Sequence, residues 1–158
     1  MKSLVYKIPT EIKIINNSQD LILEGPLGCC SIKEHKKSIQ NIYKNKIYLK
    51  SKKHFGLIKI LDKRVGGLLR GFKFEVSVSG LGNKIGVQDN ILILNLGFSH
   101  PIHILIPQDI NIFVENDKCI IIYGIHYEQL TRFVDIIIKT RKINRFTGHG
   151  LRFKKNFF

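Results

Sequence analysis

One apolar motif occurs twice in this chain and limits how the chain can fold. Residues Ile8–Ile14 read IPTEIKI, and residues Ile106–Ile112 read IPQDINI. Each copy is followed by a turn that contains asparagine, by an apolar segment and then by a glycine, Gly25 or Gly124. An internal repeat with this pattern predicts two small α+β units with a boundary near Gly71. Chance recurrence in an isoleucine-rich chain is the alternative.

Apolar spacing predicts what the two units contain. In His54–Arg70 and His126–Lys142 the apolar residues recur every three or four positions, which is typical of amphipathic helices. Short alternating or apolar runs predict strands at 12–15, 21–23, 47–49, 72–79, 91–96, 103–106, 111–114 and 119–123, and the first two read as a hairpin. We therefore expect an α+β fold of two tandem domains, each an antiparallel sheet packed on a helix. The expected boundaries are 1–70 and 71–145, followed by a basic tail without periodicity at 146–158.

Positive charge is concentrated in two blocks. The chain has 26 Lys+Arg against 12 Asp+Glu, a formal net charge of +14 and a pI near 9.8. Thirteen of these bases lie in Lys33–Lys73, and seven follow Asp135, where no acid occurs. The block Phe74–Asp135 between them has three bases and seven acids. Segregated charge indicates a surface for a polyanion, either nucleic acid or an anionic membrane, whereas a generic soluble surface mixes its signs.

No catalytic or metal-binding arrangement stands out in the sequence. The glycines of Gly80–Gly86 lead into another strand, whereas a dinucleotide loop must open a helix. His100 and His103 lie on an extended segment, so their side chains are expected on opposite faces and do not form a zinc-binding pair. A thiol or metal enzyme built on Cys29, Cys30 or His100 is one hypothesis for the function, ranked after the two RNA-binding hypotheses given below. No apolar run reaches the ~18 residues of a membrane span.

The segment Arg141–Lys155 interleaves cations, aromatic residues and glycines. Arginine can fork onto phosphate oxygens, and Phe146 and Phe153 could stack on bases or sugars. Gly148 and Gly150 would let the backbone approach an RNA strand closely. A disordered basic tail is the alternative interpretation of this composition.

Several segments resemble one family, the L-six family of large-subunit ribosomal proteins. Residues Leu96–Ile102, LGFSHPI, are similar to the family's Leu-Gly-Tyr-Ser-His-Pro-Val. Residues Gly148–Phe153 are similar to its Gly-Lys-Gly-Ile-Arg-Tyr, and Gly80–Gly82 resemble its Gly-Val-Gly-Tyr turn. Glu24–Gly28 and the Gly71–Phe72 pair also resemble family segments. Order and spacing agree across the chain, least well in residues 29–53.

The resemblance implies a duplicated α+β fold and a structural, non-catalytic role without cofactor, metal, membrane or small-molecule substrate. It implies binding to large-subunit rRNA near the sarcin-ricin loop and stalk base, beside neighbouring large-subunit ribosomal proteins. The second domain and tail are expected to supply the main contacts. The expected RNA-binding residues are Ser99, His100, Lys139, Arg141, Lys142, Arg145, Gly148, His149, Gly150, Arg152, Lys154 and Lys155, with Lys63, Arg64 and Arg70.

Compartment is predicted from composition. The chain has 27 isoleucines and no alanine, which indicates an AT-rich genome such as that of an organelle or a small bacterium. Met1–Thr10 has neither an apolar signal core nor the features of a transit peptide, so the protein is expected to act where it is made. Together with the resemblance, this favours a mitochondrially encoded member in the mitochondrial ribosome; a plastid or the bacterial cytoplasm is the alternative. A free RNA-binding regulatory module outside the ribosome is the second functional hypothesis.

Overall fold

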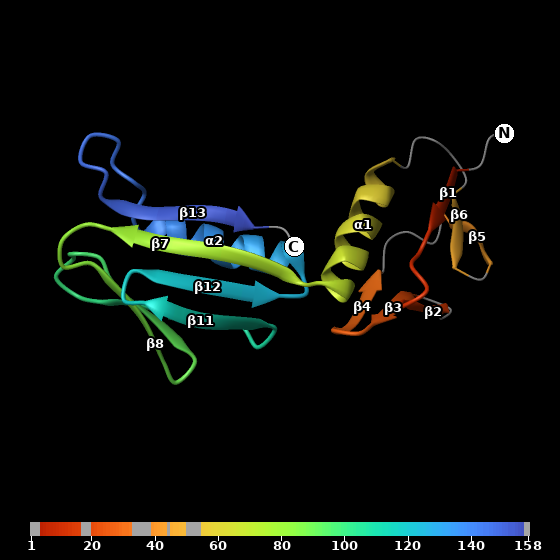
Figure 1. The fold of residues 1–158 in the computed structure, drawn as a ribbon, viewed down its shortest axis with the longest axis horizontal. Helices are drawn as coiled ribbons and strands as arrows, with labels where there is room; N and C mark the ends of the chain where they lie inside the picture. The colour runs from red at the N-terminus through yellow and green to blue at the C-terminus, as the bar shows by residue number, and fades with distance from the viewer. Residues whose placement is uncertain (1–3, 17–19, 33–38, 44, 50–54, 157–158) are drawn as a thin grey trace. The chain divides into compact units, whose positions relative to one another are not determined.

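The computed structural model describes residues 4–16, 20–32, 39–43, 45–49 and 55–156 (Figure 1). Contacts divide the chain into two compact units, Met1–Gly71 and Phe72–Phe158. Each unit combines antiparallel sheets with one helix, so the predicted α+β class is confirmed. No helix among these described residues is long and apolar enough to cross a membrane.

The first unit has two three-stranded sheets and one helix. One sheet has the order β1-β6-β5 and the other β2-β3-β4, and helix α1 contacts β3 and β4. The elements are β1 (Leu4–Lys7), β2 (Lys13–Asn16), β3 (Leu21–Gly25), β4 (Gly28–Ile32), β5 (Ile39–Tyr43), β6 (Lys46–Leu49) and α1 (Phe55–Leu69). The predicted hairpin of β2 and β3, the strand β6 and the helix are confirmed, whereas β1, β4 and β5 were not predicted. Leu57, Leu61, Val65 and Leu68 form the buried stripe of α1.

The second unit has a four-stranded sheet, a three-stranded sheet and one helix. The sheet orders are β11-β12-β7-β13 and β10-β9-β8, and α2 lies against one face of the larger sheet (Figure 1). The elements are β7 (Phe72–Ser79), β8 (Lys84–Gln88), β9 (Ile91–Asn95), β10 (Ile102–Leu105), β11 (Ile110–Asn116), β12 (Cys119–Gly124), α2 (Tyr127–Thr140) and β13 (Gly150–Asn156). Alternate residues of β7 point inward, because its burial alternates along the whole strand. They join Leu130, Phe133, Val134 and Ile137 of α2 in one core.

The predicted basic tail contains a strand that the sequence analysis missed. Gly150–Asn156 forms β13 and pairs antiparallel with β7. Leu151 is buried, and the ring of Phe153 meets that of Phe74 edge-on at 5.2 Å. The expectation of a segment without periodicity is corrected here, because these two side chains alternate with cations that point the other way.

Helix α2 ends at Thr140, earlier than the predicted end at Lys142. Arg141 has an extended backbone, with φ −150° and ψ 96°. Arg141 and Lys142 therefore begin the segment that leads to β13.

The repeated motif has the same local structure in both units. Its first isoleucine donates a backbone hydrogen bond to an asparagine carbonyl, Ile8 to Asn45 at 2.8 Å and Ile106 to Asn90 at 3.0 Å. Four positions later, an isoleucine amide donates to the carbonyl of the motif's proline, at 3.2 Å and 3.1 Å respectively. The predicted duplication is confirmed, although β1–β3 open the first unit whereas β10–β12 follow three other strands in the second.

Candidate nucleic-acid interface

Three loops meet at one end of the second unit. They are residues 80–83 between β7 and β8, residues 96–101 between β9 and β10, and residues 141–149 between α2 and β13. A Cβ placed on Gly80 would lie 3.4 Å from the His149 Cγ, and one on Gly97 would lie 3.1 Å from the Arg141 Nη1. Segments far apart in sequence are thus in contact here. This surface is termed the loop end.

Buried polar groups tie the loop end to β7. Asn83 is the one buried polar residue of the described chain, and its side-chain amide donates to the Ser79 carbonyl at 2.9 Å. The Ser79 hydroxyl donates to the Gly148 carbonyl, and the Gly150 carbonyl lies 3.2 Å away. Because buried polar groups are costly when unpaired, these bonds fix the loops against the end of the strand.

The loop after α2 is closed by its own hydrogen bonds. The Gly148 amide donates to the Asn144 carbonyl at 2.8 Å, and the Asn144 amide donates to the His149 carbonyl at 2.9 Å. The Asn144 side chain also accepts the Phe146 amide at 2.9 Å. Arg145 and Phe146 are exposed on this loop, and the Phe146 side chain is 99% exposed. The loop is therefore held by its own hydrogen bonds and exposes a cation and an aromatic ring to the surroundings.

The position of Gly150 in the fold requires a glycine. Its φ is +136°, in the region that favours glycine, and a Cβ there would lie 2.6 Å from the Ile143 Cα and 2.8 Å from the Lys142 carbonyl oxygen. Gly150 is also buried. The missing side chain thus serves the close packing of this loop on the start of β13.

Arg141 joins two of the loops. Its guanidinium lies over the Phe98 ring, 5.2 Å from the centroid, which is the distance of a cation–π interaction. Gly97, with φ +75°, leaves room for the Arg141 Nη1 beside it. Ser99 and His100 follow directly and are exposed. Arg141 therefore holds the loop that carries these two side chains.

The structure gathers most, though not all, of the predicted site residues. At the loop end lie Ser99, His100, Arg141, Lys142, Arg145, Gly148, His149 and Gly150. Arg152 and Lys154 are exposed on β13 and Lys139 is exposed in the last turn of α2. Lys155 lies in β13, but its side chain is outside the described part of the structure. Lys63, Arg64 and Arg70 belong to the first unit, which is described by itself.

The charge of this surface is not compensated. No acidic residue occurs after Asp135, and none of the cations from Lys139 to Lys154 forms an ion pair with a described residue. An uncompensated cluster of arginine, lysine and histidine on fixed loops is the arrangement that binds phosphate oxygens.

Two of the three thiols, Cys30 and Cys119, have a raised pKa. Burial raises the pKa of Cys30, and burial followed by the nearby Glu115 and Glu75 raises the pKa of Cys119 to about 11. A reactive cysteine needs a lowered pKa, because the thiolate is the nucleophile. Among the residues that the structure describes, no group of three metal-ligating side chains comes together.

Ser79, Asn83 and Phe98 were missed as site residues by sequence reasoning. Each holds a loop by contacting a residue of another segment. The glycines before Asn83 indicated a turn, but nothing local showed that its amide would be buried.

Comparison with known proteins identifies the family. No protein-family profile matches the chain. The chain is 33% identical over 144 residues to the large ribosomal subunit protein uL6m of Dictyostelium discoideum, covering 89% of this chain and 83% of that protein. It is 29% identical over 157 residues to the large ribosomal subunit protein uL6 of Mycoplasmoides gallisepticum, covering 93% and 86%. It is 28% identical over 156 residues to the large ribosomal subunit protein uL6c of Arabidopsis thaliana, covering 92% and 70%. The chain therefore belongs to the uL6 family of large ribosomal subunit proteins.

Proposed function

We propose that this protein is a structural constituent of a large ribosomal subunit and binds large-subunit rRNA through the loop end. The observation that carries this proposal is the uncompensated cationic cluster on three loops that the protein's own contacts hold together. The names of the relatives, all large ribosomal subunit proteins, support the setting.

The chemistry of the loop end suits a folded RNA. Arg145 and Lys142 can neutralise phosphates, and each neutralised phosphate releases condensed counterions. The exposed ring of Phe146 offers a face on which a base can stack. Because the loop 141–149 is already closed by internal hydrogen bonds, little ordering entropy is lost when it binds.

The finer location proposed is the stalk base near the sarcin-ricin loop, in a mitochondrial ribosome. The resemblance of the Ser99–Pro101 and Gly148–Phe153 segments to family motifs supports the first part. The uL6m relative and the isoleucine-rich, alanine-free composition support the second. Fractionation of cells that express the tagged protein tests the compartment: it should sediment with mitochondrial large subunits, and recovery with plastid or bacterial subunits would contradict the assignment.

Charge reversal at the loop end tests the RNA contact. Lys142→Glu with Arg145→Glu should lower affinity for an rRNA fragment from the stalk base by at least about tenfold, because two phosphate contacts become repulsive. The matched control is Lys13→Glu with Arg132→Glu, which changes the net charge equally on exposed residues elsewhere. The control should stay within about twofold.

Two results would contradict the proposal. One is an equal loss of affinity in the test and control variants, and the other is normal incorporation of the Lys142→Glu, Arg145→Glu protein into large subunits on a sucrose gradient. A wild-type protein that sediments only in light fractions would favour the regulatory RNA-binding module instead.

A further inference from the structure

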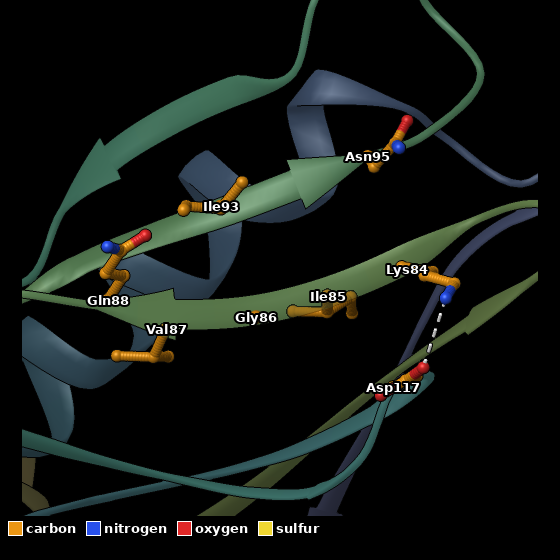
Figure 2. Close-up of a pocket in the computed structure, with 8 residues that line it drawn as sticks. All are labelled: Lys84, Ile85, Gly86, Val87, Gln88, Ile93, Asn95 and Asp117. Atoms are coloured by element: carbon orange, nitrogen blue, oxygen red, sulfur yellow. Dashed lines mark ion pairs between the residues drawn. The ribbon is translucent and has the colours of Figure 1, made fainter.

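A groove runs beside strand β8 in the second unit. In the sheet order β10-β9-β8, β8 pairs with β9 alone among the described strands and forms an edge. The groove has a volume of about 400 Å³ and is lined by β8 itself and by Ile93, Asn95 and Asp117 (Figure 2). At one end Lys84 and Asp117 form an ion pair at 3.5 Å.

Only some of the backbone groups along the β8 edge have hydrogen-bond partners in the described chain. The Ile85 amide points away from β9 and donates to the Asp117 carbonyl at 2.7 Å. Alternate residues of a strand direct their backbone groups to the same side, and the pairing of β8 with β9 has no bulge. The amide and carbonyl of Val87 therefore point away from β9, along the same edge as the Ile85 amide, and no backbone group of the described chain bonds to them there. The Asp117 carbonyl thus bonds to the first outward-facing amide of β8, at Ile85, and leaves the next one, at Val87, without a backbone partner in the described chain.

Two side-chain positions of β8 are open to the surroundings. A Cβ placed on Gly86 would meet nothing within 4 Å, and the Val87 side chain is 36% exposed. Natural sheets protect open edges with lysine, proline or bulges. Here one lysine, Lys84, lies at the start of β8, whereas the centre of the edge carries glycine and valine and lacks this protection.

The charges select the kind of partner. Lys84 is paired with Asp117, so the groove has no excess positive charge although the chain carries +14. Asp89, just beyond the other end of β8, is exposed and forms no ion pair with a described residue. This end attracts a cation, and the open edge requires alternating donors and acceptors, which a polypeptide backbone supplies and a polynucleotide does not.

We propose that the β8 edge binds an extended segment of another protein by strand addition, with a lysine or arginine of that segment beside Asp89. The inference goes beyond the rRNA-binding role, because it gives a protein partner to the least basic part of the chain.

The test uses the free full-length chain and defined peptides. The probe is a capped octapeptide of alternating lysine and valine, compared with one of alternating glutamate and valine, and binding is followed by amide shifts in NMR spectra. The lysine peptide should shift the amides of Ile85–Val87 saturably, and the glutamate peptide should bind at least about fivefold more weakly.

Val87→Pro removes the amide that points away from β9 and leaves the bonds to β9, whereas Val87→Ala keeps that amide. The first should weaken the lysine peptide by about tenfold or more, and the second by less than about threefold. A second experiment uses wild-type protein and lysine peptides that are N-methylated at alternate residues, and it tests whether binding needs the peptide's backbone amides. One methylation register should abolish binding and the other should retain it.

Several outcomes would overturn the proposal. They are equal affinity of the two Val87 variants, equal binding of both N-methylated registers or of both peptide charges, shifts confined to β10 or β11, and no saturable binding. Dimerisation of the chain through β8, or the same amide shifts with oligouridylate, would assign the edge to a second copy or to RNA. The rRNA-binding proposal fails separately: Lys142→Glu with Arg145→Glu should leave peptide binding unchanged, and Val87→Pro should leave rRNA affinity unchanged.

Discussion

The two units repeat one frame of strands and a helix, but among the described residues only the second unit adds a strand to it. In the first unit the sheet under α1 ends with β4, whereas in the second the corresponding sheet continues from β7 to β13. The motif hydrogen bonds of Ile8 and Ile106 are nearly equal in length. The repeated frame therefore supplies the core in both units, and the added strand brings Arg152, Lys154 and the closed loop before them. This difference teaches that one part of the candidate site, the loop 141–149 with the cations of β13, is an extension of the repeated frame.

The predicted RNA-binding cations of the two units also differ in what they contact. Lys63, Arg64 and Arg70 of the first unit already interact with other groups of the protein. The cations from Lys139 to Lys154 in the second have no ion-pair partner among the described residues. Apart from Arg141, which stacks on Phe98, these cations are available to a phosphate without first losing such a contact. We therefore expect the second unit to dominate RNA binding.

The largest expected effect comes from Gly150, the residue that joins the closed loop to the added strand. Gly150→Val would force a Cβ to within 2.6 Å of the Ile143 Cα, at a φ of +136°. It should lower the free energy of unfolding by about 1–3 kcal/mol or more and reduce rRNA affinity at least about tenfold. Gly86→Val is the control, because its Cβ meets nothing within 4 Å. Urea denaturation and filter binding measure both; equal losses in the two variants would show that β13 does not organise the site.

The next effect compares cations across the units. Removing two phosphate contacts with Arg152→Ser and Lys154→Ser should reduce the slope of log affinity against log salt by about 1.4–1.8, at ~0.7–0.9 per phosphate. The matched pair Lys63→Ser and Arg64→Ser in the first unit should change that slope by much less. Salt titrations of the two double variants decide the question. An equal reduction would mean that both units contact the RNA.

Periodicity predicted the elements whose apolar pattern is strong. The α2 stripe and the alternation of β7 gave both elements directly. Strand β4 was missed because Gly28–Ile32 is mostly small residues. Strand β13 was missed because the cations between Leu151 and Phe153 favoured the interpretation of a basic tail. Burial of these two side chains depends on β7 and α2, which no local pattern shows.

The candidate site was predictable in composition but not in geometry. The basic, glycine-containing segment from Arg141 and the Ser99–His100 pair were found from charge and family resemblance. The stack of Arg141 on Phe98 and the bonds from Ser79 join segments far apart in the chain. Such contacts follow from sheet order and helix packing, so the sequence alone could not show that Arg141 supports a loop.

A smaller effect is expected at Arg141, which holds the loop of the second unit that has Ser99 and His100. Arg141→Lys keeps the charge but loses the planar stack on Phe98, so rRNA affinity should fall about three- to fivefold with an unchanged salt slope. Phe98→Leu should cost about as much, and the double variant should add little. Phe146→Leu is the control, because the Phe146 ring has no described contact with Arg141. Its effect on affinity should add to that of Arg141→Lys. Full affinity in Arg141→Lys would show that the charge alone matters.

The smallest effect compares, across pH, one thiol with a raised pKa in each unit. Burial, then Glu115 and Glu75, raises the pKa of Cys119 from 9.0 to about 11, while at Cys30 burial raises the pKa and Arg64 opposes the rise. A thiol whose folded pKa is raised holds more protons folded than unfolded between these values, so its contribution to stability is complete below pH ~9 and is lost as pH rises towards ~11. Urea denaturation at pH 8, 9 and 10 should therefore show a shallower decline in Cys119→Ser than in wild type. Cys30→Ser is the comparison in the first unit, because burial also raises the pKa of Cys30. An unchanged decline in Cys119→Ser would show that the pKa of Cys119 is not raised in the folded protein.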